Sequence, residues 1–107
     1  MSFEVYKDNA GETRFRLKAS NGETILSSEG YSAKASAMNG IESVKENSKM
    51  DERFESYTDK AGKYRVRLKA TNGQVIGSSE GYESEASCKA GIESVKRWAK
   101  EAKIKEV

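Results

Sequence analysis

The chain has 107 residues, of which 36% are hydrophobic and 34% charged, and it carries a formal net charge of +2 with no histidine. No apolar run approaches the roughly 18 residues that a membrane helix needs, and the single cysteine excludes an intrachain disulfide. So small a net charge does not by itself predict a nucleic-acid partner, and such a role depends on where the cations lie. Because residues 1–6 enter a strand pattern directly, we expect no signal peptide. The single cysteine fits a reducing compartment, so we expect a cytoplasmic protein, with no membrane association.

The sequence is dominated by a repeat with a period of 51 residues. The stretch FRLKASNGETILSSEGY at 15–31 returns as VRLKATNGQVIGSSEGY at 66–82, and GIESVK follows in both copies. Each copy is smaller than the ~60 residues at which isolated domains are already marginal. We therefore predict a single domain 1–107, built of repeat one (1–50) and repeat two (51–107), which share a core about an approximate twofold axis.

Residues 3–7 and 13–19 alternate apolar and polar side chains, which is the pattern of half-buried strands, and Asp, Asn and Gly form the turn between them. The side chains expected to face the core are Phe3, Val5, Phe15, Leu17 and Ala19. In this register Glu4 lies opposite Arg16 and Tyr6 lies opposite Arg14 on the outer face, and the second copy repeats both pairs.

The next turn contains an Asn-Gly pair, a strong hairpin signal. A two-residue loop would place an isoleucine on the basic face. A three-residue loop at 20–22 with a G1 bulge instead places Ile25 opposite Leu17. We prefer the bulged loop, which also puts Leu26 and its counterpart Gly77 on the outer face.

After residue 31 the apolar residues recur at helical spacing. The expected core stripes are Ala37, Ile41 and Val44 in repeat one, and Cys88, Ile92, Val95 and either Trp98 or Ala99 in repeat two. Ser32 and Ser84 are the predicted N-caps. A glycine inside each helix, Gly40 and Gly91, costs about 1 kcal/mol relative to alanine, which predicts close approach of another backbone.

The end of the chain leaves two alternatives open. Trp98 has no aromatic counterpart in repeat one, and we predict that it caps the core near the end of the second helix; the alternative is an exposed anchor for a partner. The tail 100–107 either extends that helix or frays. The fold class predicted from these elements is α+β, with two tandem β-β-β-α repeats that share one antiparallel sheet and place two helices on one face.

The combined RLKA–NG–SSEGY–GIESVK pattern resembles the YegP-like family of small bacterial proteins, a domain of unknown function about fifty residues long that often occurs in tandem. The resemblance covers essentially the whole chain. It implies intertwined three-strand-plus-helix units and a cytoplasmic bacterial protein. It supplies no activity, cofactor or catalytic residue that could be transferred to this sequence.

The outer sheet face is the best candidate for binding, because basic groups beside aromatic rings can hold phosphates and stack bases. The predicted binding residues are Arg14, Arg16, Lys18, Arg65, Arg67, Lys69, Tyr6 and Tyr57. The alternative interpretation of these basic residues, which we favour, is that they form cross-strand ion pairs with Glu4 and Glu55 that stabilise the sheet by roughly 0.2–1 kcal/mol per pair. One carboxylate against three cations leaves about two cations unpaired in each repeat.

The other motifs favour structure over chemistry. The segment Ser27-Ser28-Glu29-Gly30 and its repeat could suggest a nucleophilic serine, but the chain has no histidine to act as its base. Cys88 is interpreted as a small hydrophobe in the helix stripe. We expect no metal site and no cofactor, since ligand spacing and phosphate-binding loops are both missing.

We therefore predict a small non-enzymatic module that binds a partner through the outer sheet face or an edge strand, with a polyanion or nucleic acid as the leading ligand. The alternative is a structural or self-associating protein-interaction domain with no small-molecule ligand. We expect a monomer or a homodimer. A pocket holding Ser28 or Ser79 beside a desolvated lysine would instead indicate an enzyme.

Overall fold

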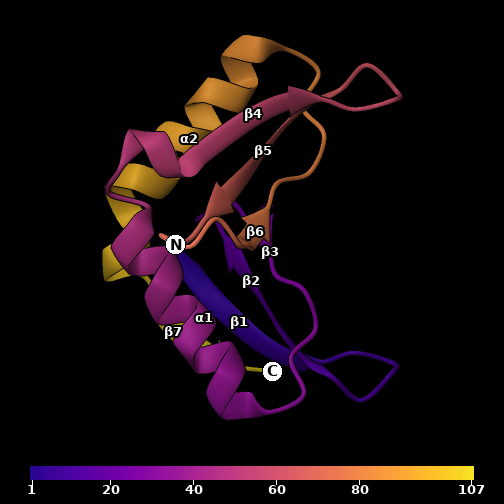
Figure 1. Cartoon of the computed structure of the whole chain (residues 1–107), viewed down its shortest axis with the longest axis vertical. Coiled ribbons are helices and arrows are strands. Elements are labelled where there is room, and N and C mark those ends of the chain that lie inside the picture. Colours follow the sequence, from indigo (N-terminus) through magenta and orange to yellow (C-terminus); the bar gives the residue numbers. More distant parts are fainter.

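The computed structural model describes residues 1–107, and Figure 1 labels their elements. Repeat one forms β1 (Ser2–Lys7), β2 (Thr13–Lys18), β3 (Thr24–Ser27) and α1 (Lys34–Asn47). A short 3-10 helix, η1 (Asp51–Arg53), leads into β4 (Phe54–Thr58), β5 (Tyr64–Lys69), β6 (Val75–Ser78) and α2 (Glu85–Trp98). The chain ends with a second 3-10 helix, η2 (Ala99–Glu101), and β7 (Lys103–Glu106).

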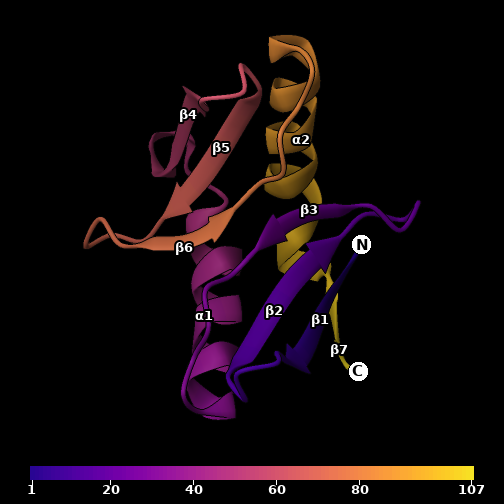
Figure 2. The same cartoon turned by 90° about the vertical axis from the view of Figure 1, so that its right-hand side faces the viewer.

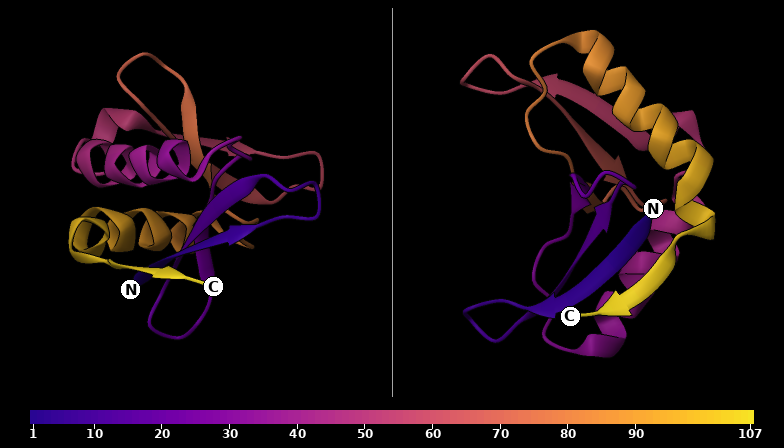
Figure 3. Two further views of the ribbon diagram at one scale, coloured as in Figure 1. Left: turned by 90° about the horizontal axis from the view of Figure 1, so that it is seen from below. Right: turned by 180° about the vertical axis from the view of Figure 1, so that it is seen from behind.

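Seven strands form one sheet in the order β4-β5-β6-β3-β2-β1-β7, and the repeats meet where Ser27 of β3 pairs with Ser78 of β6. The two helices lie on the same side of the sheet, with α2 toward one end of the molecule and α1 toward the other (Figures 1 and 3). The α+β fold, the shared sheet and the single helical layer are as predicted. The sheet is mixed, however, because β7 runs parallel to β1 while every other pair is antiparallel.

The tail adopts neither of the two structures expected for it. After η2 it forms β7, which lies beside β1 at one end of the sheet (Figure 2). Ile104 packs against the core, whereas Lys103 and Lys105 are exposed, so the side chains alternate as in any strand. Four residues are too few for that alternation to be recognised in the sequence, and the strand with which they pair lies at the other end of the chain.

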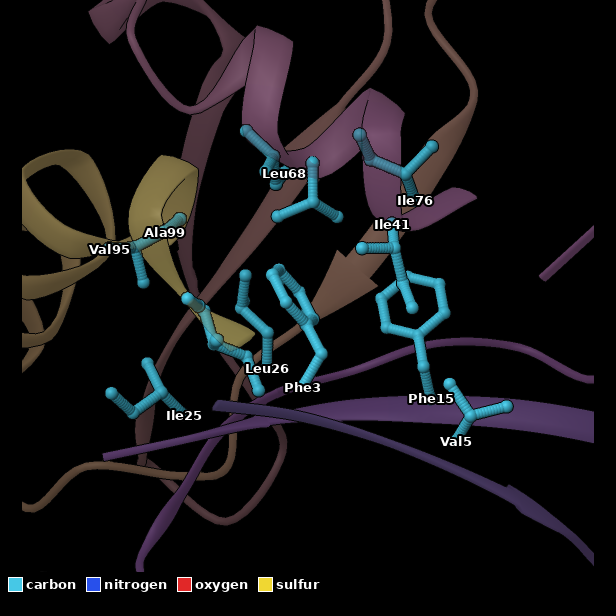
Figure 4. Close-up of a cluster of buried hydrophobic side chains, with 13 residues drawn as sticks. Phe3, Val5, Phe15, Ile25, Leu26, Ile41, Leu68, Ile76, Val95 and Ala99 are labelled. Carbon is cyan, nitrogen blue, oxygen red and sulfur yellow. The ribbon is translucent and has the colours of Figure 1, made fainter. Parts of the chain in front are cut away.

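The core joins both repeats and both helices (Figure 4). Phe3, Phe15, Leu17 and Leu68 are fully buried, and Val66 is 2% exposed, as the strand alternation predicts. The buried cluster consists of Phe3, Val5, Phe15, Leu17, Ile25, Leu26, Ile41, Val44, Leu68, Ile76, Val95, Ala99 and Ala102. A single cluster with members from each repeat confirms that neither copy has a separate core.

The β2–β3 hairpin has the predicted loop but not the predicted register. Gly22 has a φ of 88°, the left-handed conformation expected for the bulged three-residue loop. A further irregularity at the end of β2 shifts the pairing, so that Leu17 lies opposite Leu26 and not opposite Ile25. Ile25 and Leu26 are both buried, and Gly77 packs beside Leu26. The predicted outer-face position of Leu26 and Gly77 is therefore wrong, because the irregularity turns two successive side chains toward the core.

The helix ends agree with prediction in one repeat only. Ser84 caps α2, since its hydroxyl accepts the Ser87 N–H at 3.1 Å. The predicted cap at Ser32 is wrong, because α1 begins one residue later and its cap position is Ala33, the counterpart of Ser84. Neither helix is long and apolar enough to cross a membrane.

Aromatic rings, and not backbone, occupy the space over the helical glycines. A Cβ on Gly40 would lie 2.6 Å from the Tyr31 hydroxyl and 2.9 Å from the Phe15 ring. The Tyr82 ring takes the same place over Gly91. The expectation that something close offsets the cost of glycine is thus confirmed, but the predicted backbone contact is wrong.

Trp98 does not cap the core. Its side chain is 48% exposed, and the core beside it is closed by Ala99 and Ala102, which are 0% and 4% exposed. The α-helix ends at Trp98 and the chain tightens into η2, which turns the next residue inward. The alternative role of Trp98, as an anchor for a partner, stays a prediction.

Candidate functional site

The outer face of repeat one carries a cluster built around Tyr6 and Arg16. The Arg16 guanidinium lies 4.4 Å from the centroid of the Tyr6 ring, and its Nε donates to Glu4 Oε1 at 2.8 Å. Lys18 Nζ lies 3.6 Å from the same oxygen. One carboxylate therefore holds two cations, and the hydrogen bond from Arg16 lowers the pKa of Glu4.

Arg14 is held separately by the turn between β1 and β2. Its Nε donates to Asp8 Oδ2 at 2.7 Å and its Nη1 donates to the Ser28 carbonyl at 3.3 Å. Asp8 Oδ1 accepts the N–H groups of Ala10 and Glu12 at 2.9 and 3.0 Å, which closes the turn. The hydrogen bond from Arg14, followed by those from the backbone, holds the pKa of Asp8 below its ordinary value of 3.8.

Repeat two builds the same cluster from its own residues. The Arg67 guanidinium lies 4.0 Å from the centroid of the Tyr57 ring, and its Nε lies 3.3 Å from Glu55. Lys69 Nζ lies 3.1 Å from the other oxygen of that carboxylate. The predicted cross-strand pairing of Glu55 with Arg67 is present in the register of β4 and β5, as it is for their counterparts in repeat one.

Asp59 repeats the role of Asp8, and together they predict acid sensitivity. Arg65 Nε donates to Asp59 Oδ2 at 2.6 Å and lowers the pKa of Asp59. A carboxyl group whose pKa is lower in the folded chain than in the unfolded chain stabilises the folded state. This stabilisation is complete above the pKa of the unfolded chain, about 4, and is lost as the pH falls through the pKa of the folded chain. Urea unfolding between pH 5 and pH 2.5 should therefore show falling stability, with a shallower slope for Asp8→Asn combined with Asp59→Asn. Equal slopes in the two proteins would contradict this.

All six predicted cations are thus engaged in ion pairs, with the carboxylates of Glu4, Asp8, Glu55 and Asp59. The prediction of two unpaired cations per repeat, which assumed one carboxylate in each, is therefore wrong. Each repeat has three of these cations and two carboxylates, so the cations exceed the carboxylates by one. The missed signal was the aspartate that opens each first turn, because a hairpin brings the start of its turn back beside the following strand.

The strand register joins the two clusters in one row across the sheet. Arg16 pairs with Ser27, Ser27 with Ser78, and Ser78 with Arg67. Residues paired in this way project from the same face, so the two arginines lie three strand spacings apart, or about 14 Å. The sequence placed these residues on one face; only the β3–β6 pairing determines that they share a row.

β7 adds two lysines to the repeat-one end of this face, and neither was among the predicted binding residues. In the backbone register, Lys103 lies opposite Ser2, which on its other side lies opposite Lys18, and Lys105 lies opposite Glu4. Lys103 and Lys105 are exposed and make no ion pair, and with Lys18 they line a groove of about 440 Å³. The two ends of the face therefore differ in charge although the repeats are near twins.

The serine motif and the cysteine are parts of the fold. Ser28 Oγ accepts the Phe15 N–H at 2.9 Å and donates to the Glu29 carbonyl at 2.8 Å, and Ser79 makes the equivalent pair of bonds. These hydroxyls join a strand end to the loop before the helix, as predicted. Cys88 is 3% exposed, and burial raises the pKa of its thiol, which matches its interpretation as a small core residue.

A family model described as "Domain of unknown function (DUF1508)" matches the chain twice, at residues 8–55 and 59–106. The chain belongs to this family. A UPF0339 protein from the ptx operon 5' region of Stutzerimonas stutzeri is 55% identical over 106 residues, which cover 99% of this chain and 96% of the relative. The UPF0339 protein YegP of Escherichia coli K12 is 51% identical over 94 residues, which cover 88% of this chain and 86% of YegP.

Two solved structures have the same fold as this chain. Solution NMR structures of a UPF0339 protein from Shewanella oneidensis and of yegP from E. coli each give a TM-score of 0.92, at 44% and 47% identity. Each covers 98% of this chain, and the matches span 89% and 90% of those chains. The YegP-like resemblance and the tandem repeat are therefore confirmed. These relatives are uncharacterised proteins, so the family assigns no activity to the chain.

Proposed function

We propose that the chain is a small non-enzymatic binding module for anionic ligands, in particular single-stranded nucleic acid, and that it binds them on the outer sheet face at the β7–β1–β2 end. The observation that carries the proposal is the groove lined by Lys18, Lys103 and Lys105. Glu4 also lines it and is paired with Lys18, whereas the two lysines of β7 have no carboxylate partner. Free ammonium groups beside one another are suited to neighbouring phosphates.

The adjacent cluster supplies the aromatic component of such a surface. Tyr6 and Arg16 stack at 4.4 Å on the same face, and a guanidinium plane or a tyrosine ring can support a nucleic-acid base. Arg16 and Arg67 extend the row toward the other repeat. Because their charges are largely neutralised by carboxylates, we assign the main electrostatic contribution to β7.

Fluorescence anisotropy with a labelled twelve-nucleotide oligothymidine tests this assignment. We expect binding at 20 mM NaCl that weakens steeply with added salt. Lys103→Ala combined with Lys105→Ala should weaken binding about tenfold and reduce the slope of log K against log salt by about 1.4, since each phosphate contact on a single strand contributes about 0.7.

The matched control removes two exposed lysines from elsewhere. Lys49→Ala combined with Lys60→Ala makes the same change in net charge, at the end of α1 and in the β4–β5 turn. It should leave affinity and salt slope nearly unchanged. Absence of binding at low salt, or equal losses in the two double variants, would reject the proposed surface.

A further inference from the structure

We propose that the free edge of β4 is a second, independent binding surface, which takes an extended segment of a partner protein as a parallel strand and receives one bulky apolar side chain in the groove beside α2. This inference does not depend on the anion-binding face. The geometry that points to it is a difference between two nearly identical repeats.

The sheet has two ends, and only one of them is covered. β1 is paired with β2 on one side and with β7 on the other, whereas β4 is paired with β5 alone (Figure 2). Glu55, Ser56 and Thr58 of β4 are exposed. An unpaired strand presents a row of backbone N–H and C=O groups to which another strand can add.

β7 on β1 shows how an added strand lies in this fold. The N–H of Val107 donates to the Val5 carbonyl at 2.9 Å, so the peptide groups of Val5 face the added strand. In the register, Glu106 lies opposite Val5, and its carboxylate accepts a hydrogen bond from Lys34 in the first turn of α1 at 2.5 Å. The residue opposite Val5 therefore reaches the helix.

The counterpart of this position in repeat two is a groove. At its lining Ser56 replaces Val5 and Lys89 replaces Met38, which removes apolar volume beside the free edge, whereas Tyr64 replaces the smaller Thr13 on the other side. The resulting groove of about 310 Å³ lies between the end of β4 and α2. In repeat one Val5 is 4% exposed and Phe15 is fully buried, so the same space is filled.

The lining of the groove indicates what it would receive. Tyr64 and Cys88 contribute apolar surface, and the only ion pair within the helical wall is Glu85 with Lys89, at 3.4 Å. These two opposite charges neutralise one another, and Arg65, the remaining charged residue of the lining, is paired with Asp59, so the groove has no strong preference for a charged residue. A bulky apolar side chain on the added strand, opposite Ser56, would restore the volume that repeat one supplies internally.

Peptides derived from the sequence of β7 provide the probe. One is Ala-Lys-Ile-Lys-Leu-Val and the other is Ala-Lys-Ile-Lys-Ala-Val; both follow residues 102–107 but replace the glutamate at the groove position. In ¹⁵N–¹H correlation spectra of the full chain, both peptides should shift the amide signals of residues 54–58. The leucine peptide should bind about tenfold more tightly, because its larger side chain is withdrawn from water.

Two variants separate the strand contact from the groove. Ser56→Pro removes the backbone N–H that, by equivalence with Val5, faces the free edge, and both peptides should lose affinity. Ser56→Val combined with Lys89→Met introduces the repeat-one residues, and it should remove the preference for leucine while leaving strand addition intact.

Three results would overturn the proposal. Amide shifts confined to other elements would show that β4 does not accept a strand. An equal preference for leucine in the wild type and in the Ser56→Val, Lys89→Met variant would show that the groove is not used. Dimers of the wild-type chain that disappear in Ser56→Pro, measured by light scattering between 10 and 500 µM, would show that a second copy covers this edge instead.

Discussion

Replacing Leu26 with alanine should lower the free energy of unfolding by about 3–5 kcal/mol. Leu26 is 1% exposed and lies close to the β3–β6 pair that joins the repeats. Its counterpart across this junction is Gly77, at which a Cβ would lie 3.6 Å from Leu26 Cβ and Cδ1. The glycine has no side chain to move into the space that leucine leaves, so the cavity cannot collapse from that side.

The pseudo-symmetry supplies a sharp test of this explanation. Because the side chains of residues 26 and 77 approach the same space, Gly77→Leu in the Leu26→Ala background should recover part of the lost stability. Urea unfolding monitored by circular dichroism measures both steps. A loss below 1 kcal/mol for Leu26→Ala would contradict the expected cavity. No recovery in the double variant would show that the two positions do not share one volume. Val107→Ala, at an exposed site, should change stability by less than about 0.5 kcal/mol.

Removing residues 102–107 should cost about 2–4 kcal/mol and make the protein associate. The deletion removes Ala102, which is 4% exposed, the apolar cover that Ile104 gives the core, and the parallel ladder on β1. It also leaves β1 as a free edge beside fully buried Phe3. A chain with free edges at both ends of its sheet can pair with other copies at each end.

Thermal unfolding and light scattering together measure these two effects. The control is Glu106→Gln, which removes only the exposed ion pair with Lys34 and should cost less than about 1 kcal/mol. A truncated chain that keeps the stability and the mass of the full chain would show that β7 is dispensable. Association in the control variant as well would assign the effect to charge and not to the uncovered edge.

The candidate site shows which parts of a surface can be predicted from sequence. Alternation placed Arg14, Arg16 and Tyr6 on the outer face, and a hairpin of known register gave their partners across the strand pair. These inferences succeeded because they involve neighbouring strands joined by a short turn. The carboxylate of Asp8 was missed because its approach to Arg14 depends on how the turn folds back.

The lysines of β7 could not have been placed in the same way. Lys103 and Lys105 reach the outer face only because the tail crosses to β1, a contact between the two ends of the chain. Nothing within residues 100–107 specifies that partner. The free edge of β4 follows from the same event, since one tail can cover only one of two equivalent edges.

The repeat, the alternating strands, the helix stripes and the shared core could be predicted from the sequence, because each depends on local periodicity or on the small size of one copy. The exception in the stripes is Ile92, which is only half-buried and lies outside the core cluster. The tertiary structure alone decided that Leu26 turns inward and Trp98 outward, that the tail becomes a parallel strand, and that the two arginine clusters share a row. The two sets of features differ in the sequence separation of the contacts that determine them. Side-chain alternation is fixed by the backbone of one segment, whereas the order and the edges of a sheet are fixed by which distant segments bury apolar surface and pair their backbone groups together.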